Sequence, residues 1–445
     1  MDTVIFYKGE TMENRQLLKN VLRLSIPAIL TQITTIAMQY IDSAMVGKLG
    51  ANASAAIGLV SATTWVFGGI VFAIAIGFSV QVAHQVGAEK YEDARSVVKH
   101  GLLVGMALGL LLCIIGILIS KPLPIWLQAD TVIHQDATYY FLMFALMVPF
   151  MQLCTLSASF LQCSGDMLIP SILNSLMCIL DVIFNMIFIP RYGVFGAGMG
   201  TGLATVVISI IMFWVCCFKN DKLRLNRKER FIFDGKIVSS AFRIGLPVCG
   251  EQVATNFASV IITGIIAPLG TIAIAAHAFA ITAESICYMP GYGLESAATT
   301  LVGQAYGAKE YDISKKYGNM TTLLGALLMG TAGLFMFFFC PVVFRILTPD
   351  VEVQILAARV LRICLISEPL FGVSIVATGA LRGVEDTLVP GLLNLFSVWV
   401  VRIGLALLLV GNYGLEGVWV AMTIDLCFRG IILWYRLQKS PYFRK

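Results

Sequence analysis

The chain has 445 residues, of which 58% are apolar and 13% are charged, with a formal net charge of +5 and a mean hydropathy of +0.85. A water-soluble protein of this length could not bury so much apolar surface, so the composition excludes a soluble enzyme or binding module and indicates an integral membrane protein with the lipid bilayer as its main solvent. The modest net charge does not suggest a nucleic-acid partner.

Twelve apolar runs are each long enough to cross a bilayer, because about 20 helical residues span its hydrocarbon core. In chain order they are residues 21–46, 56–83, 100–119, 139–163, 168–190, 196–218, 240–267, 274–302, 319–341, 356–381, 389–411 and 415–437. These runs predict an all-α integral membrane fold with twelve transmembrane helices. Six runs precede the polar segment 219–236 and six follow it, so we expect both halves to enter the membrane from the same side.

The second half of the chain repeats the first half at an offset of 220 residues. Matching pairs are Pro27 and Pro247, Gln32 and Gln252, Gly50 and Gly270, Asp166 and Asp386, and Asn174 and Asn394; one residue is then inserted, so that Tyr192 matches Tyr413. The repeat predicts two six-helix bundles related by a parallel pseudo-two-fold axis: an N-terminal lobe (1–218), a cytoplasmic linker (219–236) and a C-terminal lobe (237–445). Such a tandem duplication is typical of a transporter whose pathway lies between the halves.

Lysine and arginine are concentrated on one side of the predicted membrane. That side includes both ends of the chain, the basic linker and, at Arg382, the loop after the tenth run. The opposite loops contain only Lys48, Lys121, Arg191 and Arg345. By the positive-inside rule, we expect both termini and the linker to lie in the cytoplasm. The compact loops are typical of a multi-pass protein of a bacterial inner (plasma) membrane.

Sequence motifs for other chemistry are missing. The chain has no G-x-x-x-x-G-K-[ST] for ATP binding, and it has neither H-E-x-x-H nor G-x-S-x-G for intramembrane hydrolysis. We therefore do not expect an enzyme or an organic cofactor. Energy for transport would come from a coupling ion, H+ or Na+, or from substrate moving downhill.

Three motifs occur in the order expected for one transporter family. They are P-A-I-L-T-Q (27–32) with Y-I-D-S-A-M-V-G-K-L-G (40–50), P-G-Y-G-L-E-S-A-A-T-T-L-V-G-Q-A-Y-G-A (290–308) and L-R-G-V-E-D-T (381–387). With these motifs the whole chain resembles the multidrug and toxic compound extrusion (MATE) family of antiporters, in the MOP superfamily. The resemblance implies two lobes around a V-shaped cavity. It also implies export of small organic, often cationic compounds against proton or sodium entry, and we expect a monomer.

Acidic residues inside a bilayer cost about 2.5–3.5 kcal/mol each and therefore indicate function. In the first half Asp42 and Asp181 fall at similar depths, and Asn185 follows Asp181 by one helical turn. The resemblance places the cation site of this lobe on Asp42, and Thr201 enters from the sixth run as the threonine of the family does. We predict a proton or sodium site at Asp42, Asp181, Asn185 and Thr201, with Na+ at Asp42 and Asp181 as the only expected metal. The alternative is a hydrogen-bonded pair that braces the helices.

The second half carries more charge within its apolar runs. Its candidates for binding substrate or ion are Glu251, Gln252, Glu284, Arg402 and Asp425. Arg402 lies in the middle of its run and needs an acidic partner, for which Asp425 and Glu284 are both suitable. The alternative for these groups is an internal ion network that contacts no substrate.

Aromatic and methionine residues provide the expected cavity wall. The candidates are Gln32, Met38, Tyr40, Tyr288, Met289 and Tyr292. A soft apolar wall with few polar groups suits varied amphipathic cations. The alternative function is a flippase of the same superfamily for lipids or lipid-linked oligosaccharides, whose cavity usually contains more arginine and lysine for pyrophosphate.

Overall fold

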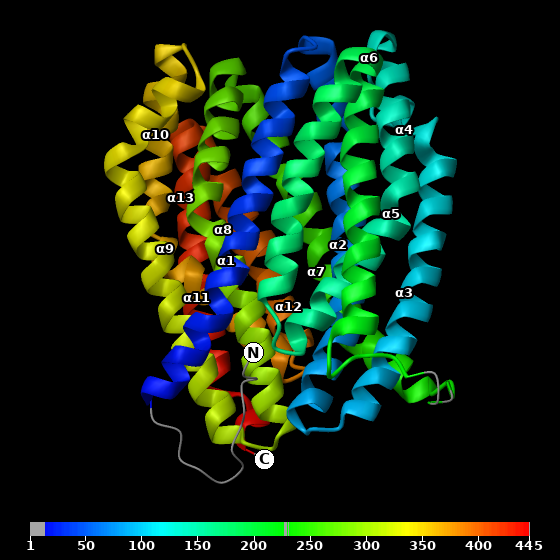
Figure 1. The fold of residues 1–445 in the computed structure, drawn as a ribbon. Helices are drawn as coiled ribbons and strands as arrows, with labels where there is room; N and C mark the ends of the chain where they lie inside the picture. The colour runs from blue at the N-terminus through cyan, green and yellow to red at the C-terminus, as the bar shows by residue number, and fades with distance from the viewer. Residues whose placement is uncertain (1–13, 227–228, 230, 445) are drawn as a thin grey trace. The chain divides into compact units, whose positions relative to one another are not determined.

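The computed structural model describes residues 14–226, 229 and 231–444, and within these residues every regular element is a helix (Figure 1). The α-helices are α1 (Asn14–Gly47), α2 (Ala51–Gly87), α3 (Tyr91–Ser120), α4 (Leu123–Trp126), α5 (His134–Cys163), α6 (Leu168–Trp214), α7 (Gly235–Ile266), α8 (Thr271–Gly307), α9 (Tyr311–Leu347), α10 (Val351–Leu365), α11 (Glu368–Gly383), α12 (Leu388–Phe396) and α13 (Ile403–Lys439). Two π-helical turns, η2 (Val215–Lys219) and η4 (Ser397–Arg402), continue α6 and join α12 to α13, and η1 (Thr131–Ile133), η3 (Ala267–Leu269) and η5 (Pro441–Arg444) are short 3-10 turns.

The predicted twelve-helix fold is confirmed once the interrupted helices are counted as separate crossings. Nine helices in the described part of the chain are long and apolar enough to cross a membrane, and the bent pair α10–α11 makes a tenth span. Two of the nine contain a reversal, at Gly193 in α6 and at Gly414 in the segment that ends with α13, each with φ of 56°. Glycine accepts this positive φ because it has no Cβ, so the chain can turn back at these two positions. Each reversal therefore divides one long segment into two of the predicted crossings.

The residue inserted in the second half is accommodated in η4. Asn174 and Asn394 are 220 residues apart, whereas the reversals at Gly193 and Gly414 are 221 apart. The π-helical turn Ser397–Arg402 lies between Asn394 and Gly414. The matching part of α6, between Asn174 and Gly193, is α-helical. A π-helical turn holds one more residue than an α-helical turn, so the insertion widens one turn and leaves the flanking helices in register.

The tenth predicted run, 356–381, forms a bent span and not one continuous helix. The chain breaks between Leu365 and Glu368, and α10 and α11 are bent by 58°. Pro369 in the first turn of α11 has no N–H with which to continue the backbone hydrogen bonds of α10. Its repeat partner Pro149 lies inside the unbroken helix α5, so proline alone does not determine the break.

The chain divides into two compact units. One comprises Ile33–Cys249, and the other comprises Met1–Gln32 together with Gly250–Lys445. The division falls within α1 and α7, a few residues after Pro27 and Pro247. It follows the packing of the helices, whereas the predicted lobe limits at 218 and 237 follow the repeat and stay a prediction.

Small residues allow close helix packing inside the Ile33–Cys249 unit. A Cβ added to Gly101 of α3 would overlap the ring of Phe160 on α5, and one added to Gly105 would overlap Leu156. Both partners are fully buried. Lipid gives helices little hydrophobic reason to associate, so this interdigitation of glycine with large side chains is what stabilises the α3–α5 contact.

The described part of the linker packs on the same unit. Lys222 Nζ donates to the carbonyl of Ser164 at 2.6 Å, and Glu229 forms ion pairs with Arg95 and Lys99 at 2.7 and 3.3 Å. Burial lowers the pKa of Lys222 to about 8, and the hydrogen bond from Arg95 lowers the pKa of Glu229. The predicted linker residues Arg227, Lys228 and Arg230 lie outside the described residues.

Candidate ion-coupling site

The structure brings Asp42, Asp181 and Asn185 together in the Ile33–Cys249 unit. Asn185 Nδ2 of α6 donates to Asp42 Oδ1 of α1 at 2.9 Å. Asp181 is fully buried, and neither of its carboxyl oxygens has a hydrogen-bond partner among the described residues. The Asp181 carboxyl is close enough to Asp42 for a hydrogen bond to form between them when one carries a proton. This is the grouping predicted from depth and helical spacing.

A glycine in the second half of α6 determines how Asn185 is oriented. The reversal at Gly193 returns the chain so that Gly200 faces Asn185, and a Cβ at Gly200 would overlap the Asn185 amide oxygen. Asn185 is 1% exposed, and with its oxygen against Gly200 its amide nitrogen faces Asp42. The α6 segment therefore holds the donor in place through a backbone contact that needs glycine.

Thr201 lies beside this group but makes no hydrogen bond to Asp42, Asp181 or Asn185 in the part of the chain that the structure describes. It lines a cavity of about 100 Å³ between α5 and α6, together with Tyr140 and Met147. Its part in the site stays a prediction, since no direct contact with the carboxyls is observed among the described residues.

Tyr140 is a member of the site that the sequence analysis did not include. It lies on α5, lines the same cavity as Thr201, and is close enough to Asp42 and Asp181 to interact electrostatically with both. A phenol can donate to a carboxylate and its ring can contact a cation. Its only signal in the sequence is a tyrosine near the outer end of an apolar run, which does not separate it from ordinary interfacial tyrosines.

The chemistry of the site follows from its donors. A buried carboxylate without a hydrogen-bond donor is costly, so it takes up a proton or pairs with a cation. Two neighbouring carboxyls hold one shared proton well, because the charged member accepts a hydrogen bond from the neutral one. No group of three or more His, Cys, Asp or Glu side chains that could hold a metal ion occurs within residues 14–226, 229 and 231–444.

Glu251 belongs to a buried network in the unit that contains Gly250–Lys445. It pairs with Arg382 Nη2 at 3.1 Å and accepts from Asn394 Nδ2 at 2.7 Å, and Arg382 also pairs with Glu295. Arg382 is 4% exposed and lies in the last turn of α11, so it is not in an exposed loop, and the side of the membrane on which it lies stays a prediction. It is buried where α11 packs tightly on α8. The close approach of these helices needs glycine, because a Cβ at Gly379 would overlap Glu295. Glu251 is therefore already paired, as in the ion-network alternative.

Asp425 is the partner of Arg402, and not Glu284. Its carboxylate accepts from Arg402 Nε at 2.8 Å and from Arg429 Nη2 at 2.9 Å, and Ser397 Oγ donates to it as well. Asp425 is fully buried and both arginines are mostly buried. The arrangement is a satisfied internal network that fixes η4 against α13. Glu284 lies apart from it and accepts a hydrogen bond from Cys364 Sγ at 3.3 Å.

The predicted cavity residues are distributed over both units. Tyr288 packs edge to face on Tyr292 at 6.1 Å and on Phe371 at 5.7 Å, and these three rings form an aromatic cluster on α8 and α11. The remaining candidates, Gln32, Met38, Tyr40, Gln252 and Met289, are half-buried. That they line a substrate cavity stays a prediction.

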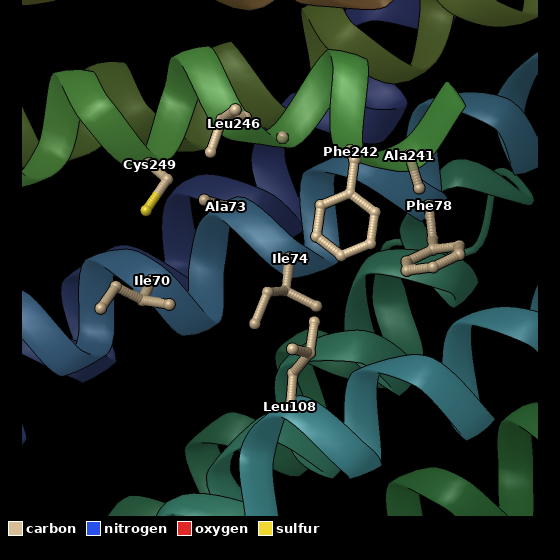
Figure 2. A pocket seen from close by; sticks show the side chains of 10 residues that line it. Ile70, Ala73, Ile74, Phe78, Leu108, Ala241, Phe242, Leu246 and Cys249 are labelled. Carbon is tan, nitrogen blue, oxygen red and sulfur yellow. The ribbon is translucent and has the colours of Figure 1, made fainter. Parts of the chain in front are cut away.

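An apolar pocket of about 150 Å³ lies between α2, α3 and α7 in the Ile33–Cys249 unit. Figure 2 shows Ile74, Leu108 and Phe242 at this pocket, with Leu246 and Cys249 further along α7. Phe242 and Leu246 are 47% and 68% exposed within a predicted membrane span, so they face lipid. The pocket contains no ionisable carboxyl or basic group and is not suited to ion coupling.

Comparisons with known proteins agree with this architecture. The profile of the family described as MatE matches residues 27–187 and again 247–408, segments that begin 220 and end 221 residues apart, as the repeat does. The probable multidrug resistance protein NorM of Pseudomonas aeruginosa is 30% identical over 444 residues, with 93% of this chain and 88% of that protein covered. The probable multidrug resistance protein NorM of Thermotoga maritima is 25% identical over 422 residues, with 93% and 90% covered.

Solved structures share the fold. A MOP superfamily transporter from Pyrococcus furiosus superposes with a TM-score of 0.90 at 22% identity, covering 98% of this chain and all of that chain. The MATE transporter VcmN of Vibrio cholerae in its bent form gives a TM-score of 0.88 at 20% identity, covering 97% and 98%.

Proposed function

The chain belongs to the MatE family of multi-pass membrane transporters, and from this premise we propose that it is an antiporter that exports small organic cations in exchange for protons by alternating access. It would act as a monomer in the inner membrane with both termini in the cytoplasm. The names of its relatives, multidrug resistance proteins, support an organic substrate. Sodium is the alternative coupling ion.

The observation that carries this proposal is the unpartnered Asp181 carboxyl next to Asp42. Both oxygens of Asp181 are buried, and Asn185 supplies one donor to Asp42. With both carboxyls charged, the pair repels itself in a poorly hydrated place. With one proton bound to Asp181, that side chain donates to Asp42 while Asn185 donates to Asp42 Oδ1, and the site becomes hydrogen-bonded. Proton uptake therefore favours a closed contact between α1 and α6, and proton release favours its opening.

A proton fits these residues better than sodium does. Hard cations need a shell of several oxygen ligands. The Asn185 amide oxygen faces Gly200, and Thr201 lines the neighbouring cavity without bonding to the carboxyls. A proton needs only two carboxyls and no further ligand.

The flippase alternative would require basic groups available for pyrophosphate. The buried arginines Arg382, Arg402 and Arg429 are each paired with an acidic side chain. Their pairing favours an organic cation over a polyanionic head group.

The energetics set a limit on one-for-one exchange. Exchange of one monovalent cation for one proton cancels the membrane potential, and a pH gradient of one unit then supports about a tenfold substrate gradient. A hundredfold gradient costs about 2.8 kcal/mol and needs either two pH units or a second proton.

Purified protein in liposomes tests the proposal. We expect an ethidium-like cation to move uphill under a proton gradient and not under a sodium gradient. Asp42→Asn and Asp181→Asn should each abolish uphill transport. Asp221→Asn, which changes an exposed acid of the linker, is the matched control. Uphill export by the Asp42→Asn protein under either gradient would refute the coupling role of this site.

A further inference from the structure

A buried histidine of α3 holds the end of the linker within the Ile33–Cys249 unit. His100 is 0% exposed, and both nitrogens of its ring make hydrogen bonds to backbone groups. Nδ1 lies 2.8 Å from the carbonyl oxygen of Ser96, one turn earlier on α3, and Nε2 lies 2.8 Å from the backbone nitrogen of Asp234. Asp234 directly precedes α7, so the ring joins α3 to the start of that helix.

The two backbone partners determine the protonation state of the ring. A carbonyl oxygen only accepts, so Nδ1 carries a hydrogen and donates it to Ser96. A backbone N–H only donates, so Nε2 carries no hydrogen and accepts from Asp234. The ring of His100 is therefore neutral in this arrangement. A second proton would place an N–H of the ring against the N–H of Asp234, and it would bury a charge that has lost one of its two hydrogen bonds.

The linker itself covers the ring. Phe231 and Phe233 pack on it, with centroids 4.9 and 5.5 Å from the centroid of the imidazole, and both are exposed themselves. On the inner side, Phe78 of α2 and Phe160 of α5 lie against Gly101, the next residue of α3. A movement of residues 231–234 away from α3 would therefore bring water to the ring.

The charged side chains of the segments that meet at the ring are engaged with other groups. Glu229 of the linker pairs with Arg95 and Lys99 of α3 at 2.7 and 3.3 Å. The Asp234 carboxylate accepts from the backbone N–H of Lys236 at 2.8 Å and so caps the first turn of α7. A second proton on the ring would add positive charge to a segment of α3 that already carries Arg95 and Lys99.

We propose that His100 is a pH-sensitive latch, whose neutral ring holds residues 231–234 and the start of α7 on α3 and whose second proton releases them. Histidine is the side chain that changes its charge between about pH 5 and 8. The contact is complete while the ring is neutral, at the higher pH, and it is lost as pH falls and the ring becomes charged. By the positive-inside rule we predict that the latch lies on the cytoplasmic side and responds to acid there.

A second contact limits how far the release extends. Gln81 Nε2 of α2 donates to the carbonyl of Ile237 at 3.2 Å, one turn into α7. Release at His100 is therefore confined to the residues before Ile237, and the rest of α7 stays packed on α2. The inference does not depend on the substrate or the coupling ion of the proposed function.

Hydrogen exchange at the Asp234 amide of the purified full-length protein measures the latch. The intrinsic effect of pH on exchange cancels when proteins are compared at the same pH. His100→Gln keeps an acceptor oxygen and gains no charge, whereas His100→Ala has no acceptor. We expect wild-type protein to match His100→Gln at about pH 7.5, and at about pH 5.5 to be about tenfold less protected than His100→Gln and to approach His100→Ala.

His134→Gln is the matched control. It changes a histidine of α5 whose Nε2 bonds to the carbonyl of Ala129, and it should exchange as the wild type does at both pH values. Wild-type protection equal to that of His100→Gln at the lower pH, or a loss of the pH effect in His134→Gln, would overturn the proposal.

Nitrogen NMR of the histidine rings gives a second test that leaves His100 in place. The chain has 4 histidines, so replacing His84, His134 and His277 with glutamine leaves the signals of His100 alone. We expect a hydrogen on Nδ1 and none on Nε2 at about pH 7.5, and hydrogens on both nitrogens at about pH 5.5. A hydrogen on Nε2 at the higher pH, or a ring that is still neutral at the lower pH, would overturn the proposal.

Discussion

Replacing Gly200 with alanine should disturb the Asp42 site without removing a polar atom. A Cβ at this position would overlap the Asn185 amide oxygen and lie 3.0 Å from both the amide carbon and the backbone nitrogen of Asn185. Since Gly200 is helical and has no positive φ, the backbone accepts alanine, and the Asn185 side chain has to rotate instead. Rotation withdraws the donor from Asp42 Oδ1.

The size of the effect follows from the lost hydrogen bond. A hydrogen bond to a charged group contributes about 1.5–3 kcal/mol. The bond is made to charged Asp42 both when Asp181 holds the proton and when the site is deprotonated, so its loss weakens the contact between α1 and α6 in both states, by a factor of about 10 to 100, since 1.4 kcal/mol is a factor of ten. Alanine is favoured over glycine inside a helix by about 0.8–1 kcal/mol, which offsets part of the cost of the close approach to the Asn185 backbone nitrogen, and a melting curve of the variant measures the change in stability apart from efflux. Function and stability are thereby separated.

Proton-driven efflux of an ethidium-like cation from liposomes measures the result. We expect Gly200→Ala and Asn185→Ala each to slow efflux about tenfold or more, and the double variant to be no slower than either, because both remove one interaction. Gly68→Ala is the control, since a Cβ there meets nothing within 4 Å. Normal efflux by Gly200→Ala, or full additivity with Asn185→Ala, would refute the claim that Gly200 orients the amide.

Three further predictions concern charges elsewhere in the chain. Asp425→Asn leaves two mostly buried arginines without their anion and should destabilise the protein by about 3–5 kcal/mol, measured as a large fall in melting temperature. Glu416→Gln at the surface should cost no more than about 1 kcal/mol. Equal effects of the two substitutions would contradict the buried network. Glu229→Gln removes two ion pairs and should speed tryptic cleavage within the linker about two- to fivefold, and an unchanged rate would show that these pairs do not hold the linker. Burial lowers the pKa of Lys222 from 10.5 to about 8, so the folded protein releases this proton at a lower pH than the unfolded protein does. The contribution of Lys222 to the free energy of unfolding is therefore flat below about pH 8 and rises between about pH 8 and 10.5. Melting temperatures of Lys222→Gln, measured across this pH range, should lack that rise.

Much of the fold could be predicted because its signals are local or periodic. Apolar runs of membrane-spanning length predict helices, and the repeat predicts equivalent elements in both halves. The reversals at Gly193 and Gly414 fall between predicted apolar runs, at equivalent places in the two halves. The α10–α11 break could not be predicted, since Pro369 breaks one helix whereas Pro149 lies within an unbroken one.

The contacts of the site were harder to predict because they join distant residues. Depth and helical spacing correctly grouped Asp42 with Asp181 and Asn185, whereas the orientation of the amide depends on Gly200 after a reversal. The burial of Arg382 was missed because a charge count treats each arginine as exposed. Its partners Glu295 and Glu251 are 87 and 131 residues away in the sequence, and only packing brings them together.

The two halves share a fold but place their carboxyls differently, so the repeat does not carry the Asp42 and Asp181 site over to the second half. With the one-residue insertion accommodated in η4, the repeat partner of Asp181 is Arg402, and the partner of Asp42 is Ile262. Arg402 is neutralised by Asp425, so that place in the second half holds an ion pair and cannot share a proton. Among the described residues of the second half, the buried carboxyl without a hydrogen-bond partner is that of Glu368, whose repeat partner is Val148.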